Sequence, residues 1–126
     1  MKPSILLIDD EPLVGKRLKP SLEKAGYEVE TFEDPEAALK RAAERNFDVV
    51  VTDMRMEGVT GMDVLNAALA RDAKTRVIII TAYATMELAR EALSKGAFEV
   101  LAKPFSPRDL RDAIGRATAA RGKAAS

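Results

Sequence analysis

The amino-acid sequence predicts an α/β fold, namely a doubly wound parallel sheet of five strands in the order 2-1-3-4-5. Short apolar runs and amphipathic helical patterns alternate five times along the chain, which is typical of parallel strands joined by right-handed helical crossovers. The runs at 5–8, 49–51 and 77–80 are apolar at every position, as in strands that helices cover on both faces. Five strand–helix units are too few for an eight-unit barrel, so the sheet should be open.

The strands are expected at 5–8, 27–32, 47–52, 76–80 and 98–102. The second alternates between polar and apolar residues, which favours a position at the edge of the sheet. The helices are expected at 12–25, 35–45, 61–71, 85–95 and 107–120.

Proline, capping residues and glycine mark the helix ends. Pro12 suits the first turn of a helix that Gly26 ends, and Pro20 within it should remove a hydrogen bond or introduce a kink. Asp34 and Ser106 are capping residue types, and each is followed directly by proline.

Length and composition indicate one globular domain. The 126 residues should form a single domain with a core from about 4 to 120 and a short polar tail at 121–126, which does not resemble the start of another domain and so favours a stand-alone protein. Twenty basic and twenty acidic side chains balance, which gives no electrostatic reason to bind nucleic acid or a membrane surface. The absence of Cys and His excludes disulfides, thiolate sites and histidine proton shuttles. The first apolar run is too short for a signal peptide or a membrane span, so a cytoplasmic protein is expected.

Polar side chains follow the predicted strands at the point where each strand ends. Asp9 and Asp10 follow the first strand, and Asp53 follows the third. Thr81 and Lys103 follow the fourth and fifth. The carboxyl ends of parallel strands meet at one edge of the sheet, and in this order ligands bind between strands one and three. We therefore expect these side chains to form one site.

These residue types suit phosphoryl transfer. Clustered carboxylates repel one another, and a divalent cation such as Mg2+, which prefers oxygen ligands, offsets that repulsion. Asp53 could then attack phosphorus and form an acyl phosphate, while Lys103 and Thr81 stabilise the charge on the phosphoryl oxygens. Taken singly, the acidic pair could be a helix cap, Asp53 a turn residue, Thr81 a strand end and Lys103 a solvated charge. Their joint order favours a phosphoacceptor site.

From 5 to about 120, the chain resembles the response regulator receiver domains of two-component signalling. The resemblance implies that Asp53 accepts a phosphoryl group from the phosphohistidine of a sensor histidine kinase or a histidine phosphotransfer protein. It implies Mg2+ bound by Asp10 directly, by Asp9 through water, by Asp53 and by the backbone carbonyl of Arg55. It also implies a phosphoacceptor that assists its own phosphorylation and dephosphorylation, and not a turnover enzyme.

The resemblance extends to the groups around the phosphoryl site. Thr81 and Lys103 match the switch hydroxyl and the phosphoryl-binding lysine. The backbone amides of Met54 and Ala82 are expected to face the phosphoryl group. The Lys103–Pro104 bond matches a turn in which this bond is usually cis, a geometry that proline alone adopts at low cost.

Further matches concern signalling. Tyr83 matches an aromatic switch residue whose ring turns inward and alters the face of the fourth helix, fifth strand and fifth helix. An unknown output partner would bind this face, or a phosphorylation-linked homodimer would form through it. The first helix, around Leu13, Val14 and Arg17, would select the kinase. The segments 53–58 and 81–85 look most like receivers of NtrC-type activators. Glu57 stands where the family usually has proline, which could loosen the loop and add a carboxylate near the metal, and Arg55 occupies a position that influences phosphoryl lifetime.

Three other functions remain open from the sequence. A receiver-fold interaction module that is never phosphorylated would usually lack one of the acids, the threonine or the lysine, and none is missing here. A haloacid-dehalogenase-type hydrolase needs a different spacing of acids after its first strand. A flavodoxin-like carrier needs a phosphate-binding loop there, where two aspartates would repel phosphate.

Overall fold

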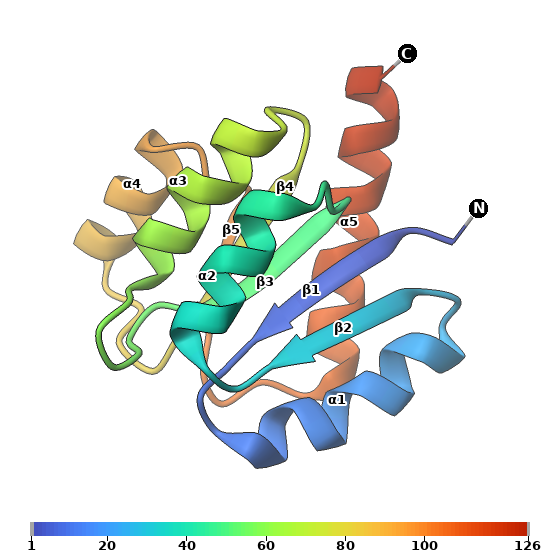
Figure 1. Ribbon diagram of the computed structural model, residues 1–126, viewed down its shortest axis with the longest axis horizontal. Coiled ribbons are helices and arrows are strands. Elements are labelled where there is room, and N and C mark those ends of the chain that lie inside the picture. Colours follow the sequence, from blue (N-terminus) through green and yellow to red (C-terminus); the bar gives the residue numbers. More distant parts are fainter. Residues whose placement is uncertain (1, 126) are drawn as a thin grey trace.

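The computed structural model describes residues 2–125 and contains the alternation that the sequence predicts (Figure 1). Its strands are β1 (Ser4–Ile8), β2 (Glu28–Phe32), β3 (Val49–Asp53), β4 (Arg76–Thr81) and β5 (Glu99–Ala102). Its helices are α1 (Pro12–Lys24), α2 (Pro35–Glu44), α3 (Gly61–Arg71), α4 (Met86–Ser94) and α5 (Pro107–Ala125). The last helix therefore continues into the expected tail, of which position 126 lies outside the described residues. Among residues 2–125, no helix is both long and apolar enough to cross a membrane.

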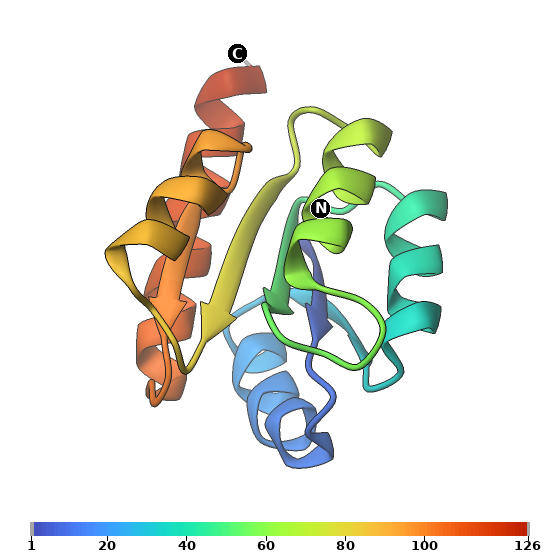
Figure 2. The ribbon, with the colours of Figure 1, turned by 90° about the vertical axis from the view of Figure 1, so that its left-hand side faces the viewer.

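The strands form one parallel sheet in the order β2-β1-β3-β4-β5, which confirms the predicted fold class. Figure 2 shows the arrowheads of the central strands at the same end of the sheet. Helices α1 and α5 cover one face, and α2, α3 and α4 cover the other (Figure 1). The polar residues that follow the strands are thus brought to one edge.

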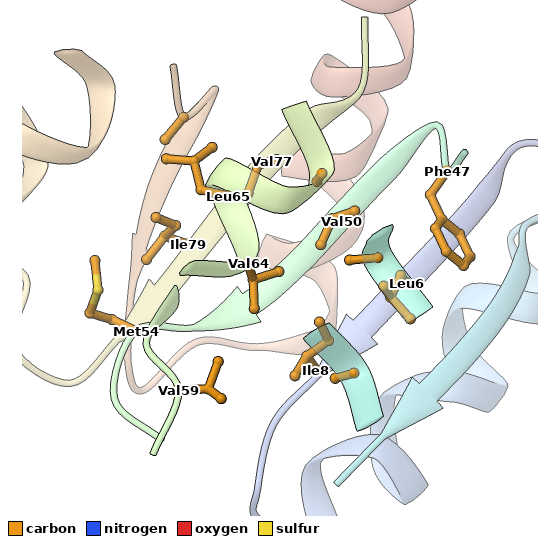
Figure 3. Close-up of a cluster of buried hydrophobic side chains, with 14 of the residues drawn as sticks. Leu6, Ile8, Phe47, Val50, Met54, Val59, Val64, Leu65, Val77 and Ile79 are labelled. Carbon is orange, nitrogen blue, oxygen red and sulfur yellow. The ribbon is translucent and has the colours of Figure 1, made fainter. Parts of the chain in front are cut away.

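A hydrophobic core lies on each face of the sheet, because every central strand is apolar on both sides. One core joins alternate strand residues such as Ile5, Val51 and Ile80 to α1 and α5. The other joins the intervening residues to the helices α2, α3 and α4, and Figure 3 shows it from Phe47 at one end to Met54 and Val59 at the other. Met54 and Val59 lie at the edge where the polar residues gather, so this core supports the loop after Asp53.

Side-chain caps fix the helices that begin near this edge. Thr60 and Asp63 form a reciprocal capping box at the start of α3, and the Thr85 hydroxyl accepts the N–H of Leu88 at the start of α4. Ser106 caps α5 as expected. The prediction for Asp34 was wrong in part, because it occupies the N-cap position of α2 but its side chain makes no capping hydrogen bond. Helix α1 continues through Pro20, whose missing N–H leaves one carbonyl without its helical donor.

Candidate functional site

Strand register places the predicted side chains at one edge of the sheet. Ile8 pairs with Thr52, so Asp9 and Asp53 follow neighbouring positions on β1 and β3. Thr81 pairs with Ala102 at the ends of β4 and β5, directly before Lys103. Asp9, Asp53 and Thr81 are all buried, which is unusual for ionisable or polar side chains and suggests a built site.

Lys103 bridges two of the carboxylates. Its Nζ donates to Asp9 Oδ2 at 3.0 Å and to Asp53 Oδ2 at 3.1 Å. The other oxygen of Asp9 accepts the backbone N–H of Glu11 at 2.9 Å. Asp9 is therefore held from both sides and in turn holds the lysine beside Asp53.

The three acidic residues also fit a divalent cation. Asp9, Asp10 and Asp53 each present a carboxylate oxygen, and these oxygens all lie within 4.8 Å of one another. Three carboxylates and the one ammonium of Lys103 leave two formal negative charges, which a divalent cation would balance. Hard oxygen donors are the ligands that Mg2+ prefers. Glu57 is exposed and is not a member of this acidic group.

Backbone and side-chain hydrogen bonds tie the end of β4 to the β4–α4 loop and to the β5–α5 turn. The Thr81 hydroxyl accepts the backbone N–H of Tyr83 at 3.0 Å, and the backbone N–H of Lys103 donates to the Thr81 carbonyl at 2.8 Å. The Lys103–Pro104 bond is cis. Ala82 follows Thr81 and is exposed. Thr81, Ala82 and Lys103 therefore lie beside one another at the mouth of the site.

The structure corrects the role expected for Met54. Its backbone N–H donates to the carbonyl of Ile80 at 2.9 Å, which continues the hydrogen bonding between β3 and β4 beyond Asp53. That amide is directed into the sheet and is not available to a phosphoryl group at Asp53. The backbone N–H of Arg55 instead donates to Asp53 Oδ1, at 3.4 Å. Of these two backbone amides, it is therefore that of Arg55 which faces the Asp53 carboxylate.

Tyr83 is tied to the opposite loop. Its ring, 59% exposed, stacks on the Arg55 guanidinium at 4.4 Å from the ring centroid. The ring thus faces the β3–α3 loop, which carries Arg55. On β5, the side chain that packs toward α4 is Val100. Tyr83 is part of the β4–α4 loop, which connects this stacked pair to the start of α4.

The environment of Asp53 favours the protonated, neutral form of its carboxyl group more than bulk water does. Burial raises the pKa of the Asp53 carboxyl above its usual value, and the ion pair with Lys103 opposes that rise only in part. Burial lowers the pKa of the Lys103 ammonium, but its hydrogen bonds to Asp9 and Asp53 outweigh burial and leave that pKa above its usual value. The lysine thus stays charged across the neutral range.

Because the pKa of Asp53 is raised on folding, its ionisation costs stability as the pH rises through the folded-state pKa. We expect Asp53→Asn, which cannot ionise, to be more stable than the parent at pH 7, with a difference that shrinks toward pH 3.8, the ordinary pKa of an Asp side chain. Lys103 does not alter this trend, because its raised pKa affects stability only in the alkaline range. Urea unfolding of both proteins at a series of pH values measures the difference. If the difference in the free energy of unfolding stayed constant or grew toward acidic pH, the raised pKa of Asp53 would be contradicted.

A groove of about 730 Å³ adjoins the site. It lies between the first half of α1 and the turn at 103–105, and its lining includes Leu13, Val14, Arg17, Ala82 and Lys103. Leu13 is 75% exposed, although it is a large apolar side chain at the start of a helix. The residues expected to select a kinase thus line a surface that leads directly to Lys103.

Comparisons with known proteins agree with this geometry. The chain matches the family described as response regulator receiver domain over residues 5–115. It is 37% identical to the C4-dicarboxylate transport transcriptional regulatory protein DctD of Pseudomonas aeruginosa, an NtrC-type regulator, over 90% of this chain and 24% of that relative. It is 32% identical to the sporulation initiation phosphotransferase F of Bacillus subtilis, over 90% of this chain and 92% of the relative. The chain thus spans about a quarter of the length of DctD.

Solved structures give the same answer for the fold. A CheY-like response regulator receiver domain protein from Methanospirillum hungatei superimposes with a TM-score of 0.90 and 28% identity, covering 98% of each chain. This superposition, the family match and the order of the five strands together establish the family of the chain. The chain belongs to the response regulator receiver domain family of two-component signalling, and its relatives include receivers of NtrC-type regulators.

Proposed function

We propose that Asp53 is the phosphoacceptor of this receiver and that phosphorylation requires Mg2+. The observation that carries the proposal is the convergence of Lys103 and two further carboxylates on Asp53, 3.1 Å from the lysine and within 4.8 Å of the acids. A merely structural ion pair would not need a third carboxylate, which raises repulsion instead of stability. A site that binds a cation beside the phosphoacceptor would give each of the three carboxylates a role.

The chain's own groups account for the chemical step. A carboxylate oxygen of Asp53 forms a bond to the phosphorus of a phosphohistidine on the donor protein, and the phosphorus–nitrogen bond breaks with its electron pair retained by the imidazole. Lys103 Nζ and the Thr81 hydroxyl lie at this edge and would donate hydrogen bonds to phosphoryl oxygens. The donor histidine must come from another protein, because this chain has no histidine.

The acidic group would hold the cation. Asp9, Asp10 and Asp53 are the side chains that fit it, and the backbone carbonyl of Arg55 completes the protein ligands that the resemblance implies. When bound, Mg2+ neutralises part of the charge that develops on the phosphoryl oxygens. Asp53 is only 8% exposed, so the surrounding protein limits the approach of water to the acyl phosphate.

The donor is proposed to dock in the groove between α1 and the turn at 103–105. This groove exposes Leu13 and reaches Lys103, so a partner helix seated there would bring its phosphohistidine to the site. A charged substitution, Leu13→Glu, should slow transfer from a phosphohistidine protein while leaving phosphorylation by acetyl phosphate unchanged. Equal loss with both donors would contradict docking at this groove.

The output surface is proposed to be the face of α4, β5 and α5. Met86 is 71% exposed and Leu93 50% exposed on α4, which leaves apolar area for a partner or for a second copy of the chain. Phosphorylation would alter this face through Thr81 and the β4–α4 loop, which carries Tyr83. Sedimentation with and without phosphodonor tests pairing, and an unchanged mass would contradict a phosphorylation-linked homodimer.

The dependence on Mg2+ tests the proposed function. Incubation with acetyl phosphate and Mg2+ should add one phosphoryl group to the intact mass, and chelation by EDTA should prevent the addition. Asp10→Asn removes one ligand and should raise the Mg2+ concentration needed for half-maximal phosphorylation by at least about tenfold.

Asp34→Asn is a matched control, because Asp34 is exposed at a helix start and its side chain makes no capping hydrogen bond. Its Mg2+ requirement should equal that of the parent. If the parent folds and binds Mg2+ but gains no mass, the proposal is wrong, and a phosphorylation-independent interaction module becomes the better explanation.

A further inference from the structure

The backbone of Asp53 is held by two residues that have no part in the proposed chemistry. The first is Thr52, which is completely buried directly before the phosphoacceptor. Its hydroxyl donates to the backbone carbonyl of Asp53 at 3.0 Å. Side chains alternate along a strand, so Thr52 is on the same side of β3 as Val50 and Met54 and opposite the carboxylate of Asp53. Val50 and Met54 belong to the core shown in Figure 3.

The second is Gly61, the first residue of α3, which is buried against the same backbone. Its N–H donates to the carbonyl of Met54 at 2.8 Å. A Cβ at this position would lie 2.8 Å from the carbonyl oxygen of Asp53 and 2.9 Å from the Cα of Met54, closer than Cβ atoms approach other atoms. Both neighbours are backbone atoms, which cannot rotate away as a side chain can. Glycine is needed here for space and not for its φ angle, which is not positive.

We propose that Thr52 and Gly61 are positioning residues that fix the main chain of Asp53 and thereby place its carboxylate against Lys103. Thr52 restrains the backbone carbonyl of Asp53 from the core side by a hydrogen bond. Gly61, which has no Cβ, allows the start of α3 to pack directly against the same carbonyl. Because a displacement of about 1 Å in a reacting group can cost about 100-fold in rate, small changes at this carbonyl should alter phosphorylation. The inference rests on the proposed function of Asp53.

A matched pair of variants separates positioning from stability. Thr52→Val keeps the shape of the side chain and removes its hydroxyl. Thr75→Val does the same at the other end of the sheet, where the buried Thr75 hydroxyl donates to the carbonyl of Phe47 at 2.6 Å. Both variants lose one buried hydroxyl–carbonyl hydrogen bond, so both should lower the urea midpoint. Only Thr52→Val should slow phosphorylation by acetyl phosphate, by about tenfold, and Thr52→Ser should restore the rate.

A second readout does not depend on phosphorylation. The carboxyl carbon resonance of Asp53, followed by NMR without phosphodonor, should shift in Thr52→Val and remain at the parent position in Thr75→Val. Equal rates and equal resonances in the two valine variants would overturn the inference while leaving Asp53 as the phosphoacceptor. Failure of the parent to become phosphorylated would instead refute the proposed function, and the NMR comparison would still decide whether Thr52 positions the carboxylate.

If Thr52→Val does not fold, Gly61→Ala gives the same test. The added methyl group must push α3 or the backbone of Asp53 aside, so phosphorylation should fall by about 10- to 100-fold. Gly115→Ala is its control, since a Cβ at Gly115 in α5 meets nothing within 4 Å, and its rate should match the parent. A Gly61→Ala protein that is phosphorylated at the parental rate would contradict the inference.

Discussion

Replacing Asp53 with asparagine is expected to abolish phosphorylation by acetyl phosphate, so that the intact mass stays that of the unmodified chain. The amide of asparagine is a poor nucleophile and carries no charge, whereas the carboxylate of Asp53 can form the acyl phosphate directly. The fold should remain, because asparagine has nearly the same shape, can accept the hydrogen bond from Lys103 and removes a buried charge. An intact mass that stays unchanged after reaction with acetyl phosphate would therefore show that the phosphoacceptor is lost, and not that the fold is lost.

The Asp34→Asn protein is the control for this result, since it loses an exposed carboxylate with no capping role and should gain one phosphoryl group like the parent. Asp53→Asn would argue against the account if it still gained a phosphoryl group at the parental rate. Such a gain would place the nucleophile on another carboxylate of the acidic group, for which Asp9 and Asp10 are the neighbours.

Removing the charge of Lys103 should have the next largest effect. Lys103→Met keeps most of the length of the side chain and loses the ammonium that lies 3.1 Å from Asp53. Loss of one preorganised donor to an oxyanion costs about 100- to 1000-fold in acyl-transfer enzymes, and we expect phosphorylation to slow by about the same factor. The buried carboxylate of Asp9 also loses its partner, which should lower stability at neutral pH.

Lys95→Met is the matched control for the lost charge. Lys95, directly after α4, forms an exposed ion pair with Glu91 at 3.3 Å, and such pairs contribute little to stability. Its phosphorylation rate should equal that of the parent when followed by intact mass over time. Lys103→Met with a rate within a few-fold of the parent would show that the ammonium does not act on the phosphoryl group.

Much of the fold follows from the sequence, because apolar runs and helix caps are local signals. The continuous runs at 5–8 and 77–80 identified the central strands, and the alternation at 27–32 placed β2 at the edge. Ser106 and Pro107 marked the start of α5 for the same reason. The end of α5 was harder to predict, because its final turns are too polar to show an apolar stripe.

The site was only partly predictable, since sequence shows which residues end the strands but not which atoms they contact. The position of Asp53 followed from its strand, whereas the bridge from Lys103 to Asp9 depends on side-chain geometry across the sheet. The Met54 amide was misassigned because strand pairing continues one residue further than the motif suggests. Arg55 and Tyr83 stack across two loops, which no local pattern reveals. The crowding at Gly61 likewise needs coordinates.

The most direct test of Asp53 as the phosphoacceptor is to locate the acyl phosphate itself. After reaction with acetyl phosphate and Mg2+, borohydride reduces an aspartyl phosphate to homoserine, and peptide mass spectrometry then identifies the position that has changed. Homoserine is expected at position 53, only in the sample that received both phosphodonor and Mg2+. Homoserine at position 9 or 10, or none in a protein that has gained a phosphoryl group, would contradict this expectation.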